Sequence, residues 1–419
     1  MRKWRKRLLI GLGALVGLLA IAVIGVVLYV QFSWDRRYDR PVPEMTAPDD
    51  PMTLARGEYI FKYTALCWAC HGPEEYINAP PAGGREFDLR DVGPPTGLGV
   101  FYASNLTPDQ ETGLGDWSDG EIIRALRQGI DREGRVIILM PFEWYRGMSD
   151  EDLLAIVAYI RSLPPVHNPV PDNRPSPFFK GILAFKFIKP EPLVTEPIEA
   201  PARGLTIEYG KYLSSNLSSC GECHTPRNLQ TGRFYMDRPF TGGNVGFEDF
   251  EYEGLEVYAR NLTPDRETGI GDWSEDDFLT AIRTGIRPDG TVIMPKFMPW
   301  LIYGDLSEDD LRAIYRYLRS LPPESNQVPA PEVGAGQTGA VKGRAVFQGY
   351  CSSCHGSEGS GTFISQVPLR QVASTMDPGI LEQFIRNGVA GTIMPGFAQT
   401  FNSEDLSALL EFLQTWEVQ

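Results

Sequence analysis

The chain has 419 residues, enough for about three ordinary domains that each bury a core. Lys and Arg number 39 against 54 Asp and Glu, which gives a net charge of −15. This balance excludes nucleic acid as a partner, because a phosphate backbone needs a basic surface. Two roles remain for the acidic surface: solubility, and attraction to basic patches on partner proteins.

The N-terminus carries five basic residues within positions 2–7, followed by 23 residues without a charge, Leu8 to Val30. At about 1.5 Å per residue a helix of this length reaches about 35 Å, enough to cross a bilayer core of about 30 Å. The apolar part of a signal peptide is usually shorter, about 7 to 15 residues. We therefore expect 1–7 to stay in the cytoplasm and 8–30 to be an uncleaved single-pass anchor in the bacterial cytoplasmic membrane. Everything after a linker at 31–51 then lies outside, and a cleaved signal is the alternative.

The remainder contains an internal repeat. Asn105 begins the stretch NLTPDQETGLGDWSDGEIIRALRQGI, which returns from Asn261 as NLTPDRETGIGDWSEDDFLTAIRTGI. Each copy precedes a predicted helix with a serine N-cap, Ser149 or Ser307, and a Pro-Pro stop. A third unit is shorter but keeps the closing helix. We expect domains at 52–166, 201–323 and 340–419, with proline-rich linkers at 167–200 and 324–339.

The first linker contains an unusual apolar segment, FFKGILAFKFIK at 178–189, with three lysines and no acidic residue. Packing against a neighbouring domain is one interpretation. Contact with a membrane surface or a partner subunit is the other.

Three strings of the form Cys-x-x-Cys-His use all six cysteines and three of the four histidines: Cys67, Cys70 and His71; Cys220, Cys223 and His224; Cys351, Cys354 and His355. A zinc site would need more ligands than one string supplies, and a thioredoxin-like site would need a βαβ setting. Haem attachment accounts for the histidine as well, because the thiols form thioethers to the porphyrin and the histidine binds the iron. We predict three covalently attached haem c groups, one per domain.

The second axial ligand of each iron is predicted to be a methionine, which together with histidine raises the reduction potential. A Met-Pro pair lies between each haem string and the closing helix, at Met140, Met298 and Met394. The second domain also offers Met294. Met140 and Met298 both precede the first leucine of their closing helices by 13 residues and Met394 by 12, whereas Met294 precedes it by 17. This spacing favours Met298.

The strings CGECHTPRN, NLTPDxETGxGDWS and MPW resemble those of the triple-haem cytochrome c subunits of bacterial alcohol, gluconate and related sugar dehydrogenases. The resemblance covers the chain from about residue 52 onward. It implies an all-α fold in which the N-terminal transmembrane helix is followed by three tandem class I cytochrome c domains. It also implies electron transfer from a dehydrogenase subunit. The retained anchor departs from these subunits, which usually have a cleaved signal.

Several further residues have two interpretations each. The family resemblance suggests that Asn105, Asn261, Trp117 and Trp273 line the haem edge and bond its propionates; closure of a structural loop is the alternative. Arg227 is expected to be solvated, with a propionate partner as the alternative. His167 lies in a proline-rich joint and is expected at the surface.

These features predict an electron carrier and no catalytic residue. Its partners would be redox proteins: a dehydrogenase subunit, a quinol-oxidising complex, an oxidase or a soluble cytochrome. A haem enzyme such as a peroxidase is the alternative. It would need one iron with an open position and a distal acid or base.

Overall fold

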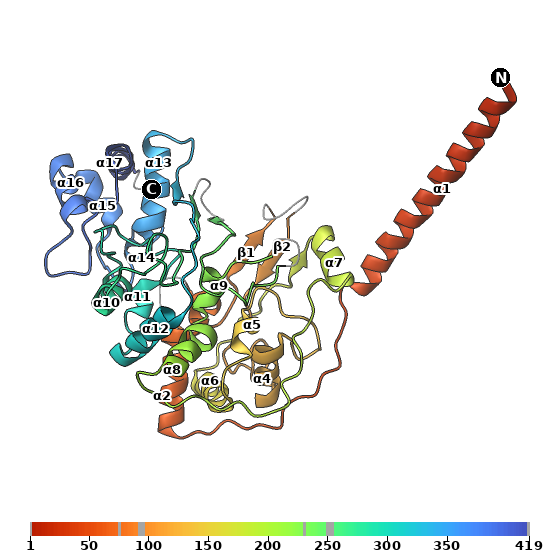
Figure 1. Ribbon diagram of the computed structural model, residues 1–419, viewed down its shortest axis with the longest axis horizontal. Coiled ribbons are helices and arrows are strands. Elements are labelled where there is room, and N and C mark those ends of the chain that lie inside the picture. The colour runs from red at the N-terminus through yellow and green to blue at the C-terminus, as the bar shows by residue number, and fades with distance from the viewer. Residues whose placement is uncertain (1, 74–76, 91–96, 229–231, 249–254, 417–419) are drawn as a thin grey trace.

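The computed structural model describes residues 2–73, 77–90, 97–228, 232–248 and 255–416. Helix α1 (Arg2–Ser33) projects from the rest of the molecule as a single rod, and the chain then returns along the surface to the first repeat (Figure 1). The stretch Trp4–Ser33 is long and apolar enough to cross a membrane. The predicted anchor 8–30 lies wholly within α1.

The first two repeats have the same order of elements. The first contains α2 (Pro51–Tyr59), the π-helix η1 (Ile60–Thr64), α3 (Cys67–His71), β1 (Glu86–Leu89), β2 (Gly99–Tyr102), α4 (Asp119–Gln128), α5 (Phe142–Tyr145), α6 (Asp150–Ser162), β3 (Arg174–Pro175) and α7 (Pro177–Ala184). The second contains α8 (Ile207–Tyr212), η2 (Leu213–Leu217), α9 (Cys220–His224), β4 (Phe247–Glu248), β5 (Leu255–Val257), α10 (Glu275–Thr284), α11 (Trp300–Tyr303), α12 (Glu308–Ser320) and β6 (Glu332–Val333). The third has α13 (Gly339–Tyr350), α14 (Ser352–His355), α15 (Leu369–Thr375), α16 (Pro378–Asn387) and α17 (Ser403–Thr415).

Each unit is built on a crossing of its first and last long helices, which are α2 with α6, α8 with α12, and α13 with α17. A glycine lies at every crossing, because a Cβ there would stand 1.9 Å from a carbonyl oxygen of the closing helix. The pairs are Gly57 with Ala155, Gly210 with Ala313, and Gly343 with Ala408. The three units therefore share one packing geometry despite their different lengths.

The mostly helical fold agrees with the prediction, but the structure adds two small antiparallel sheets. Their strand orders are β1-β2-β3 and β4-β5-β6. The third strand of each sheet comes from a proline-rich stretch that follows a closing helix. These stretches are therefore tied to the preceding unit, and the second strand of each sheet is paired on both sides.

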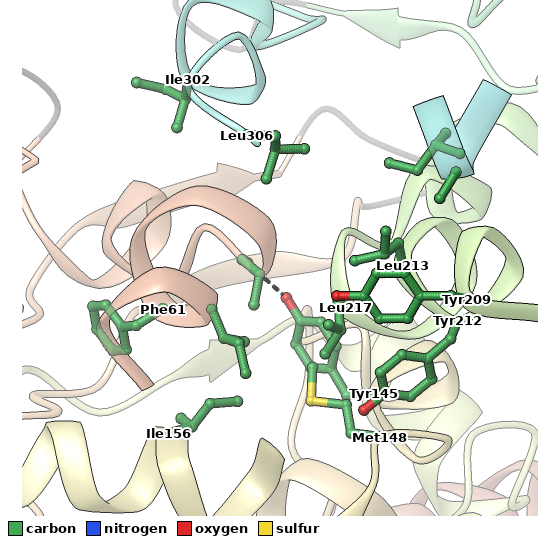
Figure 2. Close-up of a cluster of buried hydrophobic side chains, with 14 of the residues drawn as sticks. Phe61, Tyr145, Met148, Ile156, Tyr209, Tyr212, Leu213, Leu217, Ile302 and Leu306 are labelled. Carbon is green, nitrogen blue, oxygen red and sulfur yellow. Dashed lines mark hydrogen bonds between the residues drawn. The ribbon is translucent and has the colours of Figure 1, made fainter. Parts of the chain in front are cut away.

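The first two units share one apolar core, whereas the third has its own. Buried residues of both units form a continuous cluster, part of which Figure 2 shows around Tyr145, Tyr212 and Leu213. In the third unit a separate cluster forms around Phe347 and Leu409, and Val292 of the second unit packs at its edge. The chain therefore consists of a fused pair of repeats and one further domain.

A reciprocal pair of tyrosine contacts joins the fused repeats. The Tyr212 hydroxyl of the second unit donates to Asp152 Oδ2 at 2.7 Å and accepts from the Ser149 N–H at 2.9 Å. The Tyr59 hydroxyl of the first unit makes the equivalent contacts with α12, donating to Asp310 Oδ2 at 2.5 Å and accepting from the N–H at the α12 N-cap. Each repeat thus binds the first turn of the other repeat's closing helix.

The N-caps of those closing helices are the serines predicted from the sequence. Ser149 Oγ accepts from the Asp152 N–H and Ser307 Oγ from the Asp310 N–H, both at 3.1 Å. These bonds satisfy N–H groups that the first turn of a helix leaves without an intrahelical partner.

Candidate functional site

The first two Cys-x-x-Cys-His strings form short helices that begin after a sharp change of chain direction. A π-helix leads to Leu66 in the first unit and to Ser219 in the second, and both residues have left-handed backbone, with φ of 51° and 49°. A non-glycine residue in this conformation is strained, and such strain persists where the surrounding structure enforces it. The left-handed residue redirects the chain, so that the cysteines and histidines of α3 and α9 line a cavity.

The histidines of these strings are oriented by backbone carbonyls. His71 Nδ1 lies 2.7 Å from the Ser104 carbonyl oxygen, and His224 Nδ1 lies 2.7 Å from that of Arg260. A carbonyl only accepts, so Nδ1 carries the proton and the lone pair of Nε2 is free for a metal. Burial lowers the pKa of both histidines and favours the neutral, ligating form.

The third string is arranged differently. His355 Nδ1 is buried and has no hydrogen-bond partner among the described residues. The adjacent loop is fixed instead through Thr362, whose Oγ1 donates to the Cys354 carbonyl at 2.6 Å. The third histidine therefore lacks the carbonyl contact that orients the other two rings.

One cavity of about 1580 Å³ serves both of the first two strings. Its lining includes the cysteines, the histidine and the Met-Pro methionine of each of these units: Cys67, Cys70, His71, Met140, Cys220, Cys223, His224 and Met298. Most of the remaining wall is apolar and includes Trp117 and Trp273. Apolar walls, paired thiols and a histidine with a free Nε2 are what a covalently held haem requires, so the residues fit that group.

The two candidate methionines of the second unit differ in their surroundings. Met298 is half-buried and its carbonyl accepts from the Trp300 N–H at 2.7 Å at the start of α11, as the Met140 carbonyl accepts from the Phe142 N–H at 2.8 Å at the start of α5. Met294 also lines the cavity, but only 4% of it is exposed. Its Sδ would lie 2.9 Å from a Cβ at Gly349, so the sulfur points towards the third unit.

The environment of the cysteines differs from that of reactive thiols. Burial raises the pKa of Cys67, Cys220 and Cys351 to about 12 each. Thiol exchange and zinc binding both depend on a thiolate, which a raised pKa disfavours, whereas thioethers are uncharged. Within the described ranges, no group of three or more His, Cys, Asp or Glu side chains is arranged to hold a bare metal ion.

Asn105 and Asn261 serve loop closure. Asn105 Nδ2 donates to Thr112 Oγ1 at 3.1 Å and to the Val166 carbonyl at 2.8 Å, and its Oδ1 accepts from Thr107. Asn261 makes the same bonds in the second unit, to Thr268 and Glu324. Both side chains are thereby occupied within their loops, although Asn261 also lines the cavity.

Two expectations about surface residues have different outcomes. His167 is exposed, as predicted, with Nδ1 3.6 Å from Asp109 Oδ1. The expectation of a solvated Arg227 is wrong: its guanidinium is paired with Glu222 and lies 4.0 Å from the centre of the Phe234 ring. The cation is held there because the ring face and the carboxylate both attract it.

Two tyrosines in the cavity wall were missed by the sequence analysis. The Tyr145 hydroxyl donates to the Ala65 carbonyl at 2.8 Å and that of Tyr303 donates to the Ser218 carbonyl at 2.9 Å, just before the haem strings (Figure 2 shows Tyr145). Burial raises the pKa of both well above the usual value, so both remain neutral. The sequence contained a pattern that could have identified them, because each tyrosine lies five residues after the methionine of a Met-Pro pair.

Comparison with known proteins agrees with this geometry. Residues 54–164 match the cytochrome c family, and residues 339–413 match subunit III of cbb3-type cytochrome c oxidase. The chain is 30% identical to the gluconate 2-dehydrogenase cytochrome c subunit of Pantoea cypripedii, over 73% of this chain and 70% of that one. It is 28% identical to the alcohol dehydrogenase (quinone) cytochrome c subunit of Gluconobacter oxydans, over 87% of this chain and 78% of that one.

The fructose dehydrogenase cytochrome subunit of Gluconobacter japonicus is 27% identical, over 86% of this chain and 78% of that one. Each of these matches covers at least 73% of the chain, and they accord with the histidines and the apolar cavity described above. The chain therefore belongs to the family of cytochrome c subunits found in alcohol, gluconate and fructose dehydrogenases, and it is an electron carrier with covalently attached haem c.

Proposed function

We propose that the chain binds three haem c groups and relays electrons from a dehydrogenase subunit to a respiratory acceptor. The observation that carries this proposal is the single cavity that holds the Cys-x-x-Cys-His strings of the first two units. Two redox sites that line one cavity of one chain are close enough to exchange electrons without diffusion of a second protein. The domains proposed are 52–166, 201–323 and 340–419.

The roles of the chain's own residues follow from their chemistry. The three cysteine pairs would hold the porphyrins covalently, and His71, His224 and His355 would each bind one iron. Met140, Met298 and Met394 would provide the second protein ligand of each iron. Each bound haem supplies a one-electron Fe(III)/Fe(II) couple, and the methionine sulfur sets it at a higher potential than two histidines would.

Complete coordination favours a carrier over an enzyme. A peroxidase needs an open position on the iron. Each unit instead supplies a methionine that could fill this position, and the proline after each methionine restricts the backbone there. The largely apolar wall around the first two sites restricts the access of water and so limits the reorganisation that accompanies a change of charge.

For location, we propose that α1 is retained as the anchor and that the haem units lie on the periplasmic side. Basic residues precede the apolar run, which favours a cytoplasmic N-terminus. N-terminal sequencing of the mature haem-staining protein tests this. If the mature protein begins near residue 35 to 50, the N-terminal segment is a cleaved signal peptide and not an anchor.

A second candidate is a relay from a quinol-oxidising complex to an oxidase or a soluble cytochrome. The match of residues 339–413 to an oxidase subunit favours it. The two candidates differ in the protein that reduces the chain, so purification from native membranes followed by identification of the bound subunits distinguishes them. A bound dehydrogenase subunit supports the leading proposal, and a bound quinol-oxidising complex supports the second.

The experiment for the cofactor assignment is a pyridine haemochrome assay on the purified full-length protein, with three haems expected for each polypeptide. Carbon monoxide should not bind the reduced protein, while the Met140→Ala variant, which frees one axial position, should bind it and serve as the positive control. Rapid carbon monoxide binding by the unaltered protein, together with peroxide turnover, would favour the enzyme.

A further inference from the structure

The apolar segment 178–189 lies where the proposed membrane anchor ends. The Tyr29 hydroxyl of α1 donates to the Ala184 carbonyl of α7 at 3.2 Å, and the Tyr29 and Phe185 rings are 5.3 Å apart. The ammonium of Lys180 lies 4.7 Å from the centre of the Trp34 ring, just beyond α1. Figure 1 shows α7 beside the point where α1 leaves the globular part.

One face of this segment is buried against the first unit. Phe179 and Leu183 pack on Leu89 and Phe101 of the first sheet and are 3% and 9% exposed. This contact confirms that the segment packs on the first unit, but it accounts for only part of the segment's apolar surface.

The other face carries large apolar side chains that the described protein leaves uncovered. Phe178, Phe185 and Phe187 are 38%, 51% and 61% exposed. Lys186 and Lys189 are exposed among them. The segment holds three positive charges and no negative one. Excluding the five basic residues at the N-terminus, the rest of the chain carries −20 in total, because the net charge is −15.

A defined turn holds the aromatic residues in this position. Lys186 has left-handed backbone, with φ of 61°. Its N–H donates to the Leu183 carbonyl at 3.1 Å, and the Phe187 N–H donates to the Ile182 carbonyl at 3.0 Å. These two bonds form a Schellman helix end, in which glycine is usual at the position that Lys186 occupies. The side chains of Phe185 and Phe187 are therefore presented on either side of a rigid turn.

The level of this turn relative to a bilayer follows from α1. Tyr29 is the next-to-last residue of the uncharged run Leu8 to Val30, so its ring lies where hydrocarbon meets the headgroups. Phe185, in contact with that ring, lies at the same level. Aromatic rings and lysines with long apolar stems are the side chains that favour this zone.

We infer that residues 178–189 form a second membrane contact, in which the three phenylalanines enter the headgroup region of the outer leaflet and the lysines pair with anionic lipid phosphates. This inference rests on the retained anchor proposed above. The partner is the bilayer itself, because the segment is joined to the end of the spanning helix and its charge is opposite to that of the rest of the exported chain.

The contact would fix the orientation of the first unit on the membrane. Leu183 and Ile188 of the segment also line the haem cavity, together with Trp34. The first Cys-x-x-Cys-His site is therefore held close to the bilayer surface, rather than free to swing on the linker at 31–51.

Full-length holoprotein in vesicles of phosphatidylcholine and phosphatidylglycerol tests the contact. A phospholipid carrying a photoreactive diazirine near the headgroup is activated, and the labelled peptides are identified by mass spectrometry. The peptide containing 178–189 should be labelled several-fold more than the peptide containing Val341, which is 63% exposed on the third unit and serves as the matched control.

A variant with Phe178→Ser, Phe185→Ser and Phe187→Ser should lose this labelling while remaining in the membrane pellet after alkaline carbonate, because α1 still anchors it. The pair Lys186→Glu and Lys189→Glu should reduce labelling only in vesicles that contain phosphatidylglycerol. Equal labelling of the 178–189 and Val341 peptides, or labelling unchanged in the serine variant, would overturn the inference. So would crosslinking of the segment to a second copy or to a dehydrogenase subunit in place of lipid.

Loss of the anchor is a separate outcome. If N-terminal sequencing shows that α1 is removed, the proposal of a retained anchor is wrong. The mature protein is then tested for flotation with the same vesicles. Flotation that the serine variant loses would keep the lipid contact, whereas no flotation would end it.

Discussion

The glycine at each helix crossing leads to a quantitative prediction. In Gly343→Ala the new Cβ would stand 1.9 Å from the Ala408 carbonyl oxygen and 2.7 Å from Phe412 Cβ, whereas ordinary contact begins at 3.4 Å. Helices α13 and α17 would have to separate by roughly 1.5 Å and give up close contacts along their length. Overpacking of this kind costs about 1–3 kcal/mol or more, and the higher helix propensity of alanine offsets about 1 kcal/mol.

Because the clash is with backbone, the upper end of this range applies, and after the offset we expect Gly343→Ala to lower the stability of the third unit by about 2 kcal/mol. Because most of this unit's core is its own, the fused pair should be affected much less than the third unit. Urea unfolding of the full-length holoprotein in detergent, followed by pulse proteolysis and mass spectrometry of the surviving fragments, reports the two parts separately.

Gly181→Ala is the matched control. Gly181 lies within α7 with no atom near its missing Cβ, so alanine there should be neutral or should stabilise by up to about 1 kcal/mol. The reasoning is refuted if Gly343→Ala is as well tolerated as Gly181→Ala, or if it destabilises the fused pair as much as the third unit.

Three further predictions concern the fused pair. Tyr212→Phe should destabilise it by about 1–3 kcal/mol in urea unfolding, because the Ser149 N–H is left buried without a partner; an unchanged midpoint would contradict this. Met298→Ala should convert one haem to high spin and lower its potential in a redox titration. Met294→Ala should leave the spectrum intact but cost about 2–5 kcal/mol of stability, and the reverse pattern would make Met294 the ligand. Asn261→Ala should destabilise the second unit without moving any haem potential, since its side chain bonds the loop; a shifted potential would indicate a direct contact with haem.

Features that depend on local pattern were predictable. The serine caps at Ser149 and Ser307 follow from residue type and the acidic first turn, and the haem strings are defined by spacing alone. The internal repeat also implied that α6 and α12 would be equivalent, which the structure confirms.

The fusion of the first two units was not predictable in this way. It depends on contacts between residues far apart in the chain, such as Tyr59 with Asp310. In the sequence alone, Tyr59 or Tyr212 could equally be an exposed residue on the surface of a helix. The strands were missed for a related reason: those that the structure describes have two to four residues each, too few for a period-two pattern to be distinct. The paired state of Arg227 likewise depends on Phe234, which lies beside it in an antiparallel bridge.

The reciprocal tyrosine contacts have a consequence for the order of biogenesis. Tyr59 reaches Asp310 across 251 positions, so the first repeat cannot complete its packing until nearly three quarters of the chain has been synthesised. Until then the first two Cys-x-x-Cys-His strings remain accessible, and packing of the shared core afterwards forms the cavity that both strings line. We therefore expect both porphyrins to be attached before the two repeats pack together. The third unit, with a core of its own, is free to mature on a separate schedule.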